Sequence, residues 1–132
     1  MTHLLARLSE TLEGDEEYRN VGRFFTADVL FQCGGARRLV RVRGGRIAEL
    51  SREPGFDAPW DFALRAPEAI WEQFTRTPPP PFFTDIWAMR MRVPEFVWEG
   101  NTLLAAQNAR ALTRMTELLR VVRAQQEAAH GA

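Results

Sequence analysis

The chain has 132 residues and a formal net charge of +0, with 45% hydrophobic and 26% charged residues. This is ordinary globular composition, and it predicts a single domain with a substantial core. The balanced charge excludes the overall positive field of a typical nucleic-acid-binding protein. All 17 basic residues are arginine, which we interpret as the codon bias of a bacterial genome rich in G and C.

Residue content also restricts where the protein works and what it binds. We expect a cytoplasmic protein without stable membrane insertion, because no apolar run approaches a membrane span and the first residues are too charged for a signal peptide. Cys33 is the only cysteine, and the two histidines, His3 and His130, stand at opposite ends of the sequence. We therefore expect no disulfide, no metal site and no cofactor.

Residues 1–22 are predicted to form a helical cover. Four leucines in the first segment repeat at spacings of three and four, which favours an amphipathic helix. Gly14 is suited to end this helix, and Asp15 to cap a second, shorter one. A mobile lid is the alternative interpretation of this segment.

A three-stranded meander is predicted next. Apolar residues alternate with polar ones in residues 24–33, and two further strands are expected at 38–43 and 46–50. The pairs Gly34-Gly35 and Gly44-Gly45 separate the three strands, and such pairs are typical of tight hairpin turns. The pattern therefore predicts antiparallel pairing of consecutive strands.

The middle of the chain alternates between strand and helix signals. After a polar link at residues 51–59, the alternation of residues 60–66 predicts a fourth strand. Pro67 then starts a helix that runs through Phe74. The following run of four prolines in Thr75–Pro81 must be extended, and we interpret it as a stiff connector.

The last third is predicted to contain a short helix, a strand and a long helix. Asp85 can begin the short helix, and a fifth strand follows Pro94 at residues 95–98. Apolar residues recur at helical spacing over residues 101–122, which predicts one continuous amphipathic helix. The polar tail at residues 124–132 is expected to fray.

Three stretches of this pattern resemble the sterol carrier protein type 2-like domains, a family of small lipid-binding domains. They are RLVRVRGGRIAEL, WDFALRAPEAIWEQF and FVWEGNTLLAAQNARALTRMTELLR, and the likeness covers most of residues 24–122. Asn101 departs from the family pattern, which has an acidic residue in that turn. The resemblance implies an α+β fold: an antiparallel five-stranded sheet, covered on one face by helices, that encloses an apolar cavity. Residues 1–132 would then be one domain with its core at 24–122.

The resemblance implies non-catalytic binding of an apolar small molecule, such as a lipid or a sterol. The residues that we expect in the cavity wall are Trp60, Phe62, Trp87, Phe96, Trp98, Leu104, Asn108, Ala111 and Met115. Aromatic and methionine side chains suit adaptable apolar pockets, and they equally suit an ordinary core. Asn108 falls on the apolar side of the long helix, where its amide needs a partner in the sheet or on a ligand.

The sequence is compatible with two other functions. A small cavity enzyme would use Asp28, Asp61 or Glu99 as acid and base, provided that burial raised the pKa of one carboxyl group. An interaction subunit would have a filled cavity and would bind a partner, or a second copy as a homodimer, through an aromatic patch at Phe82, Phe83 and Trp87. Light scattering and the placement of the carboxylates distinguish these alternatives.

A cluster of arginines lies in and beside the predicted hairpins. Its members are Arg37, Arg38, Arg41, Arg43 and Arg46. Such a cluster can bind RNA or a lipid headgroup. Because acidic residues follow it and the net charge is balanced, we interpret it as a solvated face paired with acids, and we expect no nucleic-acid partner.

Overall fold

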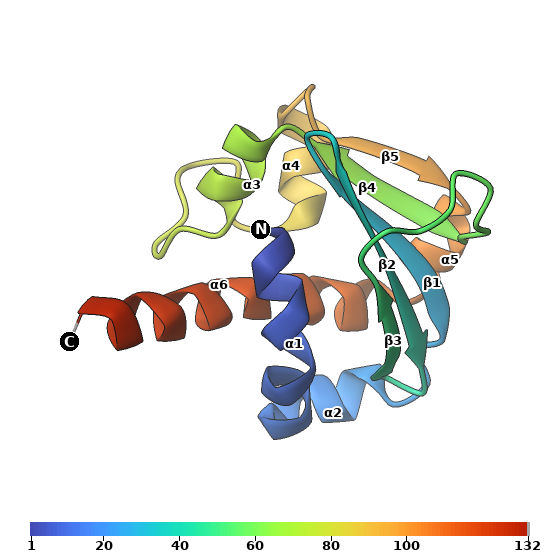
Figure 1. The fold of residues 1–132 in the computed structure, drawn as a ribbon, viewed down its shortest axis with the longest axis horizontal. Coiled ribbons are helices and arrows are strands. Elements are labelled where there is room, and N and C mark those ends of the chain that lie inside the picture. Colours follow the sequence, from blue (N-terminus) through green and yellow to red (C-terminus); the bar gives the residue numbers. More distant parts are fainter. Residues whose placement is uncertain (132) are drawn as a thin grey trace.

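A five-stranded sheet forms one layer of the computed structural model, which describes residues 1–131 (Figure 1). Its strands are β1 (Ala27–Cys33), β2 (Ala36–Arg43), β3 (Arg46–Ser51), β4 (Phe62–Ala66) and β5 (Val97–Gly100), in the order β3-β2-β1-β4-β5. The first three strands form the predicted antiparallel meander. Gly44 and Gly45 in its second turn have φ values of 57° and 83°, a region that glycine adopts without steric cost.

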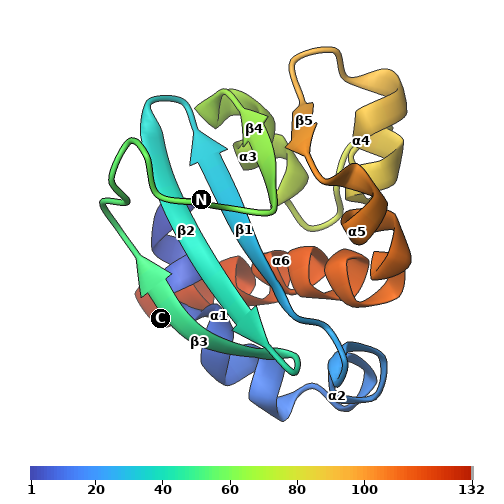
Figure 2. The same cartoon turned by 90° about the vertical axis from the view of Figure 1, so that its right-hand side faces the viewer.

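The prediction of a purely antiparallel sheet is wrong at one pair of strands. β4 lies beside β1 in parallel register, with Val29 opposite Phe62, so the sheet is mixed. The cause is the link between β3 and β4, which returns from the far edge of the sheet across its outer face (Figure 2). Strand β5 then pairs with β4 antiparallel and forms the other edge.

Helices cover the opposite face of the sheet (Figure 1). They are α1 (Thr2–Gly14), α2 (Glu16–Gly22), α3 (Glu68–Phe74), α4 (Ile86–Arg92), α5 (Thr102–Gln107) and α6 (Ala109–Gly131). The leucine stripe of α1 is fully buried, as the spacing predicted. Alternate residues of β1 from Ala27 to Cys33 face the same core. Burial of these apolar faces against one another is the main force that holds the two layers together.

The predicted long helix is two helices that meet at Asn108. This residue leaves helical geometry, with φ −115° and ψ 30°, and its side-chain Nδ2 donates a hydrogen bond to Leu104 O at 3.0 Å. An asparagine side chain that donates to a backbone carbonyl of the preceding turn competes with the backbone hydrogen bonds of the helix, which explains the break. Beyond it, α6 continues through residues 124–131, where fraying was expected. Ala132 lies outside the described residues.

An ion pair joins the corner between α1 and α2 to α6. Arg114 donates from Nε and Nη2 to the two carboxylate oxygens of Asp15, at 2.9 and 2.8 Å. Asp15 also caps α2, since it accepts a bond from the backbone N–H of Tyr18. The hydrogen bonds from Arg114 hold the pKa of Asp15 below its usual value, against the opposing effect of burial.

This pair predicts a stability difference that depends on pH. A lowered folded-state pKa stabilises the protein above the unfolded pKa of about 3.9, and that stability is lost as the pH falls through the folded value. Asp15→Asn is expected to cost about 1 kcal/mol at neutral pH. The difference from the native chain should disappear in strong acid, as measured by urea unfolding across a pH series. A difference that stays constant with pH would contradict this assignment.

Candidate functional site

The interior between the sheet and the helices is where the resemblance to the sterol carrier protein type 2-like domains implied a binding cavity. Phe62, Phe96, Ala111 and Met115 lie there, each at most 4% exposed, and they belong to one continuous apolar core. Other predicted wall residues, Trp87, Trp98 and Leu104, are partly buried and pack against the same core. The described residues show a continuous apolar core in this interior, and they do not show a cavity within it.

Trp60 does not join this set. It packs on the outer face of the sheet, with Ala58, against a small separate cluster of Leu30, Leu39 and Ala63. The alternation that paired Trp60 with Phe62 fails because the strand begins only at Phe62 and the chain bends at Asp61. The placement of Trp60 in the cavity wall is therefore corrected: it covers the face that the helices leave open.

Asn108 also differs from the expectation. Its amide neither reaches the sheet nor points from a buried helical face, since it closes the end of α5 through the bond to Leu104 O. The residue is only partly buried. Its role in the structure is to end one helix and start the next.

The core reaches the surface at a set of aromatic residues that we call the aromatic corner: Trp87 of α4, Phe96, and Trp98 of β5. The ring centroids of Trp87 and Trp98 are 4.7 Å apart, and Phe96 meets Trp98 edge-on at 6.1 Å. The guanidinium of Arg90 lies over the Trp98 ring at 5.0 Å. Such aromatic and cation–π contacts hold the ring of Trp98 at the sheet edge.

The indole N–H groups of Trp71, Trp87 and Trp98 differ in whether they have a hydrogen-bond acceptor. Trp71 donates to Gln32 O at 2.9 Å, and Trp87 donates to Thr113 Oγ1 at 2.7 Å. Trp98 Nε1 is buried and has no hydrogen-bond partner among the described residues. A buried donor without an acceptor costs about 1–3 kcal/mol, so this atom marks a place that favours an acceptor.

The three carboxylates proposed for an enzyme do not meet in the interior. Asp28 forms ion pairs with Arg41 and Arg43, both at 2.9 Å. Asp61 accepts a bond from the backbone N–H of Asp28 at 2.7 Å, and Glu99 pairs with Arg65 at 3.2 Å. Each carboxylate therefore has a backbone or arginine partner, although Asp28 Oδ1 is held by the ion pair with Arg43 and not by a hydrogen bond. The three groups do not form an acid–base pair that faces the apolar core.

The aromatic patch proposed for a partner is smaller than expected. Phe82 is 52% exposed and has a positive φ of 73°, while Phe83 is only 9% exposed and belongs to the core. Arg92 covers the Phe82 ring at 5.2 Å. Because Phe83 faces inward and Trp87 is partly buried, Phe82 is the one residue of the predicted patch that is largely open to solvent.

A surface hollow of about 640 Å³ brings together the two histidines that the sequence separates. His3 and His130 both line it, beside Glu72 and Arg123. Burial lowers the pKa of His3, with smaller contributions from the N-terminal amine and Arg123. No cluster of three or more metal-ligating side chains is found among residues 1–131.

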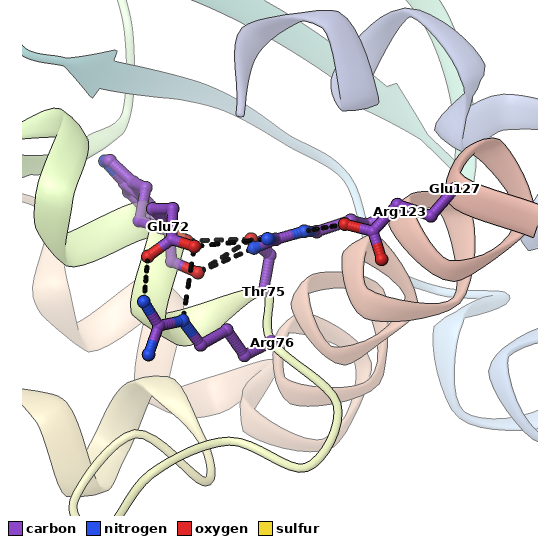
Figure 3. A network of polar contacts seen from close by, with 6 residues as sticks. Glu72, Thr75, Arg76, Arg123 and Glu127 are labelled. Atoms are coloured by element: carbon purple, nitrogen blue, oxygen red, sulfur yellow. Dashed lines mark hydrogen bonds and ion pairs between the residues drawn. The ribbon is translucent and has the colours of Figure 1, made fainter. Parts of the chain in front are cut away.

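The polar network beside this hollow is structural (Figure 3). Arg123 of α6 donates to the backbone oxygen of Glu72, to its carboxylate and to Thr75 Oγ1, and it also pairs with Glu127. Bonds from Arg76 and Arg123 lower the pKa of Glu72. Since a helix leaves its last carbonyls without intrahelical partners, Arg123 caps α3 and fixes it to α6.

Comparison with solved structures shows the fold. The chain superimposes on a crystal structure of sterol carrier protein 2 with a TM-score of 0.69 and 15% identity, covering 89% of this chain and 94% of that one. It also matches a conserved hypothetical protein from Thermus thermophilus, described as possibly a sterol carrier protein, with a TM-score of 0.63 and 18% identity over 88% of this chain and 80% of that one.

The chain therefore has a sterol carrier protein 2-like fold, as the resemblance implied. No family model and no curated protein matches its sequence. None of the described helices is long and apolar enough to cross a membrane. At these identities the likeness establishes the fold alone.

Proposed function

We propose that the protein binds an apolar small molecule, such as a lipid or a sterol, between its sheet and its helices, without catalysis. The fold likeness supports this proposal, and so does the continuous apolar core of that interior. The observation that carries it is the aromatic corner, where this core reaches solvent beside a buried indole N–H that lacks an acceptor. An apolar ligand with one acceptor oxygen satisfies both features.

The ligand enters by displacing side chains at this corner. Trp87, Trp98 and Leu104 are the predicted wall residues that combine partial exposure with contact to the core. They lie on short elements, α4, β5 and α5, and β5 is an edge strand of only 4 residues. Short elements with few backbone hydrogen bonds open at lower cost than central ones.

Affinity comes mainly from apolar burial. Each Å² of apolar surface removed from water contributes about 25 cal/mol, from which the cost of displacing the corner and ordering the ligand is subtracted. The Trp98 N–H adds a directed bond of about 1 kcal/mol. The balance predicts binding of long, flexible or flat apolar molecules in preference to small polar ones.

A titration with a fluorescent fatty acid and a fluorescent sterol tests the proposal, with energy transfer from tryptophan as the readout. We expect saturable binding of at least one probe. We expect Trp98→Phe to weaken this binding about five- to tenfold, because the indole N–H that donates a hydrogen bond to the ligand is lost. Trp60→Phe, on the outer face, is the matched control and should bind like the native chain. Failure of both probes to bind the native protein would overturn the proposal.

A further inference from the structure

A second pocket, far in the sequence from the aromatic corner, opens between α2 and the turn that joins β2 to β3. Its volume is about 410 Å³, and α1 contributes one wall. In Figure 1 these elements lie together at the lower end of the molecule. Neither the predicted apolar site nor the sequence pattern assigns it a role.

Hydrogen bonds from and to Gly44 and Gly45 hold the floor of this pocket. Tyr18 donates its hydroxyl hydrogen to Gly45 O at 2.7 Å, and the N–H of Gly45 donates to Phe25 O at 2.8 Å. The N–H of Gly44 donates to Thr26 Oγ1 at 3.0 Å. Burial raises the pKa of Tyr18, so its hydroxyl stays neutral. The backbone donors of the turn are thus occupied, and a ligand must be held by side chains.

Three arginines supply those side chains. Arg19, Arg23 and Arg46 line the pocket, and none of them forms an ion pair with a described residue. In contrast, Arg41 and Arg43 on the adjacent strand both pair with Asp28. The arginine cluster that the sequence suggested is therefore divided. Arg41 and Arg43 are paired with Asp28, whereas Arg46 lines the pocket with Arg19 and Arg23.

The charge balance of the pocket favours an anion. Glu13 is the one carboxylate among its lining residues, against three guanidinium groups. Guanidinium groups bind phosphate oxygens by paired, charge-assisted hydrogen bonds. With a net charge of +0 for the whole chain, such an excess is local rather than a consequence of composition.

An exposed aromatic residue stands beside the pocket. Phe24 is 82% exposed, and the guanidinium of Arg23 lies over its ring at 5.1 Å. An aromatic ring next to cationic side chains can enter the interfacial region of a lipid bilayer while the cations contact headgroups.

We propose that this pocket binds a phosphate group through Arg19, Arg23 and Arg46. The source of the phosphate is either a phospholipid headgroup at a membrane surface or a free phosphorylated small molecule. This site is independent of the apolar site, so each can be disproved without the other.

The first experiment is an NMR titration of the native chain with inorganic phosphate, followed at the amides of Gly44 and Gly45. We expect saturable shifts, and a loss of affinity of roughly tenfold or more in Arg19→Gln/Arg23→Gln/Arg46→Gln. The matched control, Arg37→Gln/Arg52→Gln/Arg110→Gln, removes the same charge elsewhere and should titrate like the native chain. Single Arg46→Gln repeats the test should the triple variant unfold. No saturable shift in the native chain, or equal losses in both triple variants, would overturn the proposal.

The second experiment separates the two sources. Native protein is sedimented with vesicles of phosphatidylcholine, with and without phosphatidylglycerol. If the source is a lipid headgroup, the protein sediments with the anionic vesicles, and Phe24→Ser weakens this binding while phosphate titration is unchanged. Phe56→Ser, at a side chain that is 97% exposed, is the control for an aromatic residue elsewhere. Phosphate binding without vesicle binding assigns the pocket to a free phosphorylated molecule.

Discussion

Replacing Trp71 with alanine is expected to lower the free energy of unfolding by about 3–5 kcal/mol. The side chain is 0% exposed and meets Phe74 and Phe96 edge-on, at 5.9 and 5.5 Å between ring centroids. Its indole N–H also donates to Gln32 O in β1, so truncation leaves a cavity and removes this hydrogen bond. Urea unfolding measures the loss.

A matched control is available at Phe56. This residue is also aromatic but 97% exposed, and Phe56→Ala should change stability by less than about 0.5 kcal/mol. Trp71→Phe should lie between the two, because an aromatic ring remains and the hydrogen bond is lost. A Trp71→Ala chain that unfolds within about 1 kcal/mol of the native value would show that Trp71 does not tie α3 to the sheet as described.

The second large effect is expected at Gly45. Its φ of 83° is costly for any residue with a Cβ, by roughly 1–2 kcal/mol. In addition, a Cβ at this position would lie 2.5 Å from the backbone oxygen of Gly22, which cannot move aside as a side chain can. Gly45→Ala should therefore cost about 2 kcal/mol or more in stability, and it should distort the floor of the arginine-lined pocket.

Gly14 is the control for this substitution. A Cβ there meets nothing within 4 Å, and the residue ends α1 without a positive φ. Gly14→Ala should be neutral or stabilising by up to about 1 kcal/mol. Thermal unfolding of both variants measures the comparison, and equal melting temperatures would refute the steric argument.

Local sequence patterns predicted most of the elements because their causes are local. The leucine spacing of α1 and the glycine pairs of the hairpins act over a few residues, and both are observed as expected. The parallel pairing of β4 with β1 was missed because it depends on the path of the link across the sheet, which no short-range signal encodes.

Burial in the core was predictable for several apolar residues of the expected cavity wall, whereas their role in binding stays a prediction. Phe62 and Met115 share a core because strand and helix periodicity place them on inward faces. Trp60 was misplaced because alternation was extended past the bend at Asp61. The unpaired N–H of Trp98 depends on which acceptors happen to lie nearby, and only the tertiary structure determines that.

The arginine-lined pocket could not be predicted from the sequence for the same reason: it depends on the tertiary structure. Arg46 was visible in the sequence as one of a basic cluster, but its neighbours Arg19 and Arg23 come from a helix and a corner much earlier in the chain. Asp28 removes Arg41 and Arg43 from that cluster by pairing with them. Which arginines remain unpaired is a property of packing rather than of local sequence.

The most direct test of ligand binding is native mass spectrometry of freshly purified protein, repeated on the same sample after denaturation. The proposed function predicts an additional mass on the native chain that is lost on denaturation and corresponds to an apolar small molecule. A bare chain mass in both spectra, together with no uptake of a fluorescent fatty acid or sterol, would contradict it.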